Sequence, residues 1–324
     1  MAAKIDISSQ RSEEIIDLRR LTARDLEPLL QEECASWLRD LSWDFTMSAD
    51  LVGRFVEMRA LSGSALLIDG EVAGYMYYVV EEDKGLIGDV YVRQQFRTVE
   101  RENLLLATAL VPMMDAPAVR RIESQLMMLQ HDRKQTAPHA ECLSMFERNF
   151  MRIDLMQNTL AKGRVRRPVY IEKWSDHYHD AAANLIAAAY AGHVDSRIND
   201  QYRTPAGARR FLHNIVVYPG CGTFHRAASY VAFEGVSGAL CGISLASLVT
   251  PASGHVTQIC VSPMVRGTGV GHELLRQTLG TLRGMGCSTA SLTVTDANED
   301  AVSLYERVGF ETIHRFWAMV WEGF

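Results

Sequence analysis

The residues of this chain most capable of chemistry lie in the segment 258–275, QICVSPMVRGTGVGHELL. A β-branched strand ends there at Val261, and residues 266–271 (RGTGVG) lead directly into an amphipathic helix. Glycine lets backbone N–H groups approach a ligand closely. Several such groups at a helix N-terminus form an anion site, to which Arg266 adds a positive charge. The pattern predicts a phosphate or pyrophosphate ligand; the alternative is a glycine-rich turn that binds nothing.

The spacing of the glycines separates this loop from two other phosphate-binding motifs. No Lys-Ser or Lys-Thr pair follows the last glycine, and glycines at 267, 269 and 271 do not fit G-x-G-x-x-G. A second motif, N-x-x-A-x-x-L-Y-E-x-x-G-F, runs from Asn298 to Phe310. Together, R-G-x-G-x-G after a V-x-P strand end and this downstream motif resemble the two hallmarks of the GNAT superfamily of N-acyltransferases, over residues 168–324.

The resemblance implies a binding site for acetyl-CoA and none for a metal. The pyrophosphate would lie on the glycine loop, and the pantetheine would bond the backbone of a bulged strand that separates from its neighbour. One backbone N–H would polarise the thioester carbonyl. The cofactor-binding residues predicted in this way are Ile259, Cys260, Val261, Arg266, Gly267, Thr268, Gly269, Val270, Gly271 and Asn298.

Two catalytic residues are predicted from the same resemblance. Tyr305 matches the hydroxyl that protonates the departing CoA thiolate; the alternative is a core aromatic on an amphipathic helix. His255 matches, by alignment, the position of the general base on the strand before the loop. An imidazole suits a base at neutral pH, but an exposed histidine at a strand start needs no role. Gln258, nearer the loop, cannot accept a proton.

The order of predicted elements occurs twice along the chain. In the first half we expect strands at 15–21, 64–68, 71–80, 86–92 and 121–126 and helices at 23–38, 47–59, 100–110 and 140–149, with a hairpin turn at Asp69-Gly70. In the second half we expect strands at 168–173, 228–233, 239–249, 255–261, 289–295 and 312–321 and helices at 178–190, 204–216, 271–283 and 298–308. The fold class is therefore α/β, as two tandem GNAT-like domains, each a mixed, mostly antiparallel sheet flanked by helices.

The two predicted domains differ in their loops. We expect domain boundaries at 1–157 and 168–324, with a basic linker at 158–167. Alignment of the halves places Arg97 on Arg266, but Glu100 on Gly269 and Glu102 on Gly271. Two carboxylates would repel a pyrophosphate. With Phe146 aligned on Tyr305, the first domain resembles a degenerate GNAT domain without a CoA site.

The loop between the first two helices of the second domain, residues 191–207, is long and polar. It holds His193, Asp195, Arg197, Asn199, Asp200, Gln201 and Tyr202. The resemblance implies that this region shapes the acceptor site; the alternative is an ordinary surface loop. The histidines of residues 176–180 (DHYHD) point to different faces of a helix and do not form a metal site.

Composition limits the functional classes. The 324 residues carry a net charge of −6, which argues against a nucleic-acid binder. The six cysteines are scattered and read as free thiols, and no apolar run reaches the ~18 residues of a membrane span, so we expect a cytoplasmic protein. The sequence predicts an N-acetyltransferase acting by direct attack of a primary amine, of a small-molecule acceptor, on acetyl-CoA. The alternative is a non-catalytic acyl-CoA sensor or scaffold. Homo-oligomerisation is compatible with either.

Overall fold

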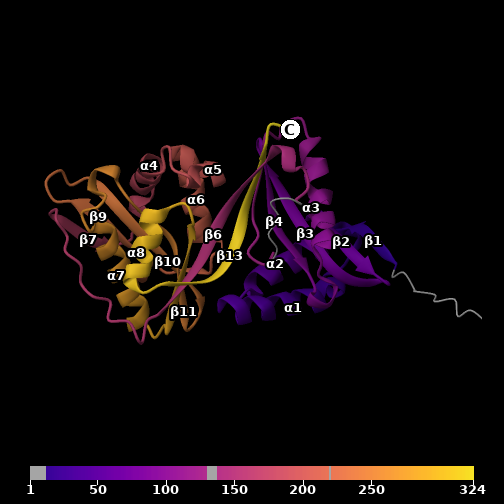
Figure 1. Ribbon diagram of the computed structural model, residues 1–324, viewed down its shortest axis with the longest axis horizontal. Helices are drawn as coiled ribbons and strands as arrows, with labels where there is room; N and C mark the ends of the chain where they lie inside the picture. The colour runs from indigo at the N-terminus through magenta and orange to yellow at the C-terminus, as the bar shows by residue number, and fades with distance from the viewer. Residues whose placement is uncertain (1–11, 130–136, 219) are drawn as a thin grey trace, which may run out of the picture. The chain divides into compact units, whose positions relative to one another are not determined.

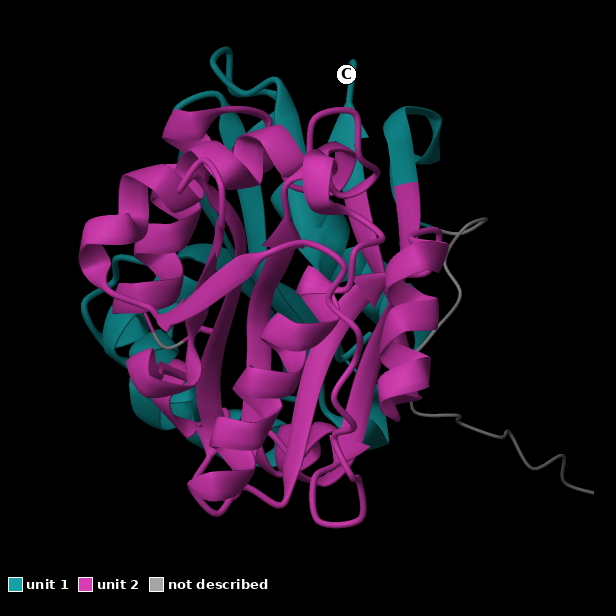
Figure 2. Cartoon of the chain, turned by 90° about the vertical axis from the view of Figure 1, so that its left-hand side faces the viewer, with its two compact units in different colours: residues 1–33, 49–144, 320–324 teal, residues 34–48, 145–319 magenta. Residues whose placement is uncertain are grey.

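The computed structural model describes residues 12–129, 137–218 and 220–324 (Figure 1). The chain divides into two compact units, shown in different colours in Figure 2. Unit 1 contains residues 1–33, 49–144 and 320–324, and unit 2 contains residues 34–48 and 145–319. Each unit is described by itself.

Unit 1 is built on strands β1–β5 with helices on the sheet. Its elements are β1 (Glu13–Asp17), α1 (Ala23–Leu41), α2 (Thr46–Glu57), β2 (Ser62–Ile68), β3 (Glu71–Glu81), β4 (Lys84–Val92), α3 (Val99–Met114) and β5 (Arg121–Gln125), with the last turns of α1 and the first of α2 assigned to unit 2. Strands β1 to β4 are antiparallel in sequence order, and β4 pairs with β5 in parallel. Asp69 and Gly70 both have positive φ (52° and 84°), as the predicted tight hairpin turn requires.

Unit 2 repeats this order with additional strands. Its elements are β6 (Leu143–Asp154), β7 (Val169–Lys173), α4 (His179–Ala189), α5 (Asp195–Ile198), α6 (Pro205–Val217), β8 (Thr223–Phe224), β9 (Tyr230–Glu234), β10 (Leu240–Thr250), β11 (Ser253–Val261), α7 (Val270–Gly284), β12 (Thr289–Thr295), α8 (Glu299–Val308) and β13 (Glu311–Glu322). The strand order is β13-β6-β12-β11-β10-β9-β7, with β11 and β12 parallel and the other registered pairs antiparallel.

Helices cover both faces of the unit 2 sheet. Helices α4 and α6 pack through Ala183 and Leu212 against Ile243 and Leu245 of β10. Helices α7 and α8 cover the other face, and Figure 1 shows them together in front of the strands. Their contacts include buried Leu275 and Leu279 against Ala246 and Val256. Successive side chains of a strand point to opposite faces of the sheet, so the strands contribute to two separate core layers.

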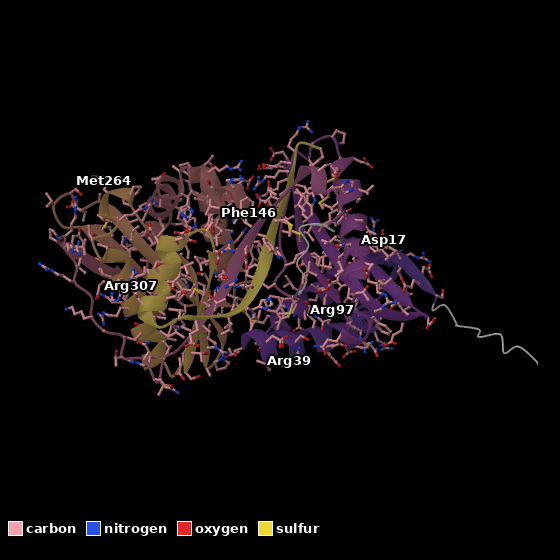
Figure 3. All side chains as sticks on the ribbon, viewed as in Figure 1. Asp17, Arg39, Arg97, Phe146, Met264 and Arg307 are labelled. Atoms are coloured by element: carbon pink, nitrogen blue, oxygen red, sulfur yellow. The ribbon has the colours of Figure 1, made fainter. Side chains whose placement is uncertain are left out.

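The predicted fold class is confirmed in each unit, but one predicted element is wrong. Residues 140–149 do not form a helix: a 3-10 turn at Ala140–Cys142 leads into strand β6. Strand β6 pairs with β12 over Arg148–Asp154, and its residues Phe150 and Met151 are fully buried. The helical alignment of Phe146, labelled in Figure 3, with Tyr305 is therefore wrong as well. A short, half-apolar segment matches both the helical and the strand periodicity. Here, pairing with a neighbouring strand determines its conformation.

The compact units also differ from the predicted domain ranges. Residues 34–48 and 145–157 belong to unit 2, whereas residues 320–324 belong to unit 1. Within unit 1, the Trp321 indole donates a hydrogen bond to the Pro138 carbonyl at 3.0 Å, and Arg121 bonds Glu322. Each unit thus contains residues that the predicted domain boundaries assign to the other domain.

Candidate acyl-transfer site

The candidate site lies where strands β11 and β12 of unit 2 separate. The two strands pair in parallel from Ser253 to Val256 of β11. Thr257 then forms a bulge opposite β10, and residues 258–261 continue to pair with β10. In the described part of the chain, the pairing with β12 does not extend beyond Val256. Backbone N–H and C=O groups of residues 259–261 on the β12 side are therefore not paired with β12.

The glycine loop connects this strand to helix α7. Gly267 and Gly269 have positive φ (70° and 91°), and Gly269 is the residue at which α7 begins. Among the described residues, the backbone N–H groups of Gly269, Val270 and Gly271 donate no hydrogen bond, because they precede the first carbonyl available within the helix. A Cβ on Gly271 would lie 3.7 Å from Val261 Cγ1, an ordinary contact. The unused donors fit a pyrophosphate.

The linker packs directly on this loop, which the sequence did not predict. The Arg166 N–H donates to the Thr268 carbonyl at 2.8 Å, and a Cβ on Gly269 would approach the Arg164 carbonyl oxygen to 2.4 Å. Gly269 is therefore required both by its positive φ and by the linker. On the other side, Arg266 Nη2 donates to the carbonyl of Ala189 at the end of α4. The loop is held from two directions.

Helix α8 carries Tyr305 into the site. Gly309, with a φ of 107°, ends the helix by donating to the Tyr305 and Glu306 carbonyls, and Phe310 packs its ring against Tyr305 at 6.0 Å between centroids. This explains the downstream G-F pair as a helix stop. Burial, and after it the negative charge of Asp195, raises the pKa of the Tyr305 hydroxyl. The Asn298 side chain precedes α8 without capping it, so it is free to bind a ligand.

An aromatic wall borders the unpaired part of β11. The Gln258 amide donates to the Tyr190 hydroxyl at 3.0 Å, and Tyr190 stacks on Tyr202 with 4.5 Å between ring centroids. Beside them, burial raises the pKa of the Cys260 thiol to about 12, although Gln258 and then Arg266 act to lower it. The Cys260 thiol is therefore neutral at physiological pH.

The segment 191–207 contributes a carboxylate that sequence reasoning named without giving it a role. Asp195 Oδ1 accepts a hydrogen bond from the Thr295 hydroxyl at the end of β12. Asp195 Oδ2 lies 3.7 Å from His193 Nδ1, which also accepts the Asp195 N–H at 3.2 Å. The polar signature of this loop was visible in the sequence, but its docking on β12 was not.

The other predicted catalytic residue, His255, lies in a different environment. It is on the paired part of β11, before the bulge, and is 4% exposed. Its Nδ1 is 2.9 Å from Ser291 Oγ, and the Trp43 and Phe150 rings lie at 4.9 and 6.1 Å between centroids. Burial lowers the pKa of His255 to about 3. A histidine this weakly basic is a poor proton acceptor at neutral pH, which opposes the predicted role.

Comparison with known proteins agrees with this geometry. Residues 210–310, which include the glycine loop and all of α8, match the profile of the acetyltransferase (GNAT) family. This segment, about a third of the chain, is therefore similar to the GNAT family. Acyl transfer is the reaction class of this family, and the match lies within unit 2.

Solved GNAT structures share the fold of the whole chain. A GCN5-related N-acetyltransferase from Sphaerobacter thermophilus is 18% identical with a TM-score of 0.68, covering 96% of this chain and 95% of that chain. A tandem GNAT protein from the clavulanic acid biosynthesis pathway is 15% identical with a TM-score of 0.58, covering 96% of this chain and 98% of that chain. At these identities the likeness is one of fold.

One curated relative matches a short segment. Mycothiol acetyltransferase from Corynebacterium jeikeium (strain K411) is 36% identical over 62 residues. The match spans 19% of this chain and only 18% of that GNAT protein's length.

Unit 1 repeats the backbone of the GNAT site but fills the loop differently. Gly88 forms the bulge in β4, and pairing with β5 ends at Ile87. Where unit 2 has its glycine loop, Arg97 Nε lies 3.7 Å from Glu102 Oε1, with side chains only 8% and 1% exposed. The Arg97 guanidinium also lies over the Tyr91 ring, 5.1 Å from its centroid. An internal ion pair thus lies at the position that aligns with the pyrophosphate site.

Two features are absent from the described residues. They contain no group of three or more His, Cys, Asp or Glu side chains placed to hold a metal ion. None of the helices in this part of the chain is both long enough and apolar enough to span a membrane.

Proposed function

We propose that unit 2 transfers an acetyl group from acetyl-CoA to a primary amine of a small-molecule acceptor. The observation that carries the proposal is one convergence: unused N–H groups at the start of α7, unpaired backbone on β11 and the Tyr305 hydroxyl meet at a single separation of strands. Each feature alone has a structural explanation, but their coincidence matches the parts of an acyl-CoA substrate in order.

Different residues of the chain bind the pyrophosphate, position the thioester and donate the proton. Gly269, Val270 and Gly271 hold the pyrophosphate through backbone N–H groups, and the positive end of α7 favours its charge. The backbone of residues 259–261 positions the thioester, where one N–H polarises the carbonyl. The Tyr305 hydroxyl, fully protonated at neutral pH, donates to the departing thiolate.

Direct attack by the amine is the route that the site favours. A covalent acyl-enzyme needs an activated nucleophile, and Cys260 is the thiol on the unpaired part of β11. Since its pKa of about 12 keeps this thiol neutral, it is a weak nucleophile at neutral pH. The acceptor amine itself therefore attacks the thioester.

We further propose that unit 1 has no acetyl-CoA site and serves a structural role. The Arg97–Glu102 pair satisfies its own charges where a pyrophosphate would bind. The catalytic domain of the predicted division, residues 168–324, thus corresponds to the greater part of unit 2.

Titration calorimetry of the whole chain with acetyl-CoA tests this proposal, followed by CoA release with a panel of primary amines. We expect one site per chain and amine-dependent release of free thiol. Two sites would contradict the asymmetry between the units. Binding without release by any amine would favour the sensor or scaffold, and no binding would overturn the proposal altogether.

A further inference from the structure

Asp195 is a carboxylate whose basic neighbour among the described residues is His193, with 3.7 Å between Oδ2 and Nδ1. Its side chain is 13% exposed, and among the described residues no lysine or arginine lies within ion-pair distance of it. Nearby arginines are directed elsewhere: Arg148 Nη2 donates to Thr293 Oγ1 at 3.2 Å, and Arg203 Nε donates to the Ser196 carbonyl at 2.7 Å. A largely buried carboxylate is unfavourable unless hydrogen bonds and an opposite charge compensate it.

The structure holds this carboxylate in a fixed position. Thr295 is 1% exposed, at the end of β12, and its hydroxyl fixes Oδ1. The His193 ring fixes the backbone of Asp195 through the N–H bond to Nδ1, and it packs on Tyr190 with 5.2 Å between ring centroids. A largely buried carboxylate that Thr295 and His193 hold, with no lysine or arginine in ion-pair contact among the described residues, is suited to bind a small cation.

The surroundings of Asp195 suit an organic ammonium group. The stacked Tyr190 and Tyr202 offer aromatic faces and edges, and tyrosine faces attract cations. The charge of Asp195 reaches the predicted acid: burial and then this charge raise the pKa of Tyr305. Geometry links them as well: Thr295, whose hydroxyl holds Asp195, accepts the Asn298 N–H through its carbonyl at 2.9 Å, directly before helix α8, which carries Tyr305. We therefore assign the carboxylate to the same site as Tyr305.

From this arrangement we infer that Asp195 binds the ammonium group of the acceptor, which makes cationic primary amines the substrate class of unit 2. The inference rests on the proposed acyl transfer for its role in turnover, although cation binding at Asp195 can be measured without it. His193 Nδ1 lies 3.7 Å from the carboxylate and already accepts the Asp195 N–H, so it positions the carboxylate.

Each proton that moves during the transfer has a donor and an acceptor. The ammonium gives one proton to water, and the free amine forms a bond to the thioester carbon. The C–S bond breaks, and Tyr305 gives its proton to the thiolate. The nitrogen, now acylated, loses its second excess proton, which restores the Tyr305 hydroxyl.

Calorimetric titration with benzylamine, protonated at pH 7.5, tests the cation site on the whole chain. We expect Asp195→Asn to weaken benzylammonium binding by about 10- to 100-fold, the range for losing a charge-assisted hydrogen bond. Thr295→Val keeps the carboxylate but removes its hydrogen bond, so we expect a smaller loss of about fivefold. Benzyl alcohol, which has the ring without the charge, is expected not to bind.

Matched controls separate this inference from the proposed function. Asp180→Asn removes the same charge from an exposed position on α4 and is expected to leave benzylammonium binding unchanged. Acetyl-CoA is titrated into every variant, and Asp195→Asn is expected to keep wild-type donor affinity. Equal cation affinity in Asp195→Asn, equal binding of benzyl alcohol, or no cation binding by the wild type would each overturn the inference. Loss of donor binding in the wild type would instead overturn the proposed function.

Discussion

The two units share a backbone but differ in the loop that follows the bulged strand. In β4 and β11 the parallel pairing ends at aligned residues, Ile87 and Val256, and the bulge follows at once, at Gly88 and Thr257. The separation of strands is therefore present in both units. The difference begins one turn later, where a glycine loop in unit 2 corresponds to a charged helix start in unit 1.

This difference teaches that strand geometry alone does not make the site. In unit 2, positive φ at Gly267 and Gly269 leaves backbone donors unused for a ligand. In unit 1, Thr98 caps α3 by accepting the Arg101 N–H, and the Arg97–Glu102 pair occupies the aligned position. Figure 3 labels Arg97 in unit 1 and, before the glycine loop of unit 2, the exposed Met264. A few side chains at a helix start thus place an ion pair in unit 1 where unit 2 has unused backbone donors.

The largest effect is expected from copying unit 1 into the loop of unit 2. Gly271→Glu places a carboxylate at the pyrophosphate position, and we expect acetyl-CoA affinity to fall by more than about 100-fold. The fold has room for the Cβ, 3.7 Å from Val261. Calorimetry measures the affinity, and Gly280→Glu is the control, on the same helix with no atom within 4 Å of its Cβ. Unchanged affinity in Gly271→Glu would show that the pyrophosphate binds elsewhere.

The reverse change in unit 1 is expected to destabilise it without creating a site. Glu102→Gly leaves Arg97, 8% exposed, without this carboxylate, and we expect the free energy of unfolding to fall by about 3 kcal/mol. Urea denaturation measures this loss, with Glu100→Gln at an exposed position of the same helix turn as control. A stoichiometry that rises to two acetyl-CoA molecules would show that Glu102 alone blocks a second site.

Removal of the Tyr305 hydroxyl is expected to have an intermediate effect. Tyr305→Phe should lower kcat by about 10- to 100-fold, with little change in donor affinity, because a thiolate with a pKa of about 8.5 departs slowly without an acid. Steady-state kinetics separate the two parameters. Tyr230→Phe, which loses a hydroxyl bond to Thr281 away from the site, is the control. Equal turnover in Tyr305→Phe would remove Tyr305 from the acid role.

The smallest effect concerns His255, which aligns with Leu86 of unit 1. The pKa of His255 is about 3 in the folded chain against 6.5 for an ordinary histidine, so the unfolded chain binds the extra proton below pH 6.5. The stability from this group is present above pH 6.5 and is lost as the pH falls toward 3, by about 2 kcal/mol at pH 5.

His255→Leu tests this linkage by copying the unit 1 residue. We expect the acid-dependent loss of stability between pH 7 and 5 to shrink by this amount, measured by denaturation at each pH. Turnover at neutral pH is expected to stay within about threefold of the wild type, since general-base catalysis is worth about 100-fold or more. A loss of that larger size in a folded variant would restore His255 as the base.

Local sequence was sufficient for most elements and for the loop. Strand β12 and the predicted range 289–295 coincide, because β-branched residues and flanking turns define it without help from distant contacts. The glycine spacing and the tyrosine motif were sufficient to indicate the family, because glycine conformation and helix termination are properties of a few adjacent residues.

Tertiary structure decided the features that depend on residues far apart in the chain. Residues 143–149 became part of strand β6 because β13 and β12 offer partners on its two sides, which no local period reveals. Burial beneath Trp43 and Phe150 turned His255 from a plausible base into a neutral core residue. The hydrogen bond between Thr295 and Asp195 places a carboxylate of the polar loop at the end of β12. Desolvation and hydrogen-bond partners set the charge state of a side chain, and both come from residues that the linear sequence leaves far away.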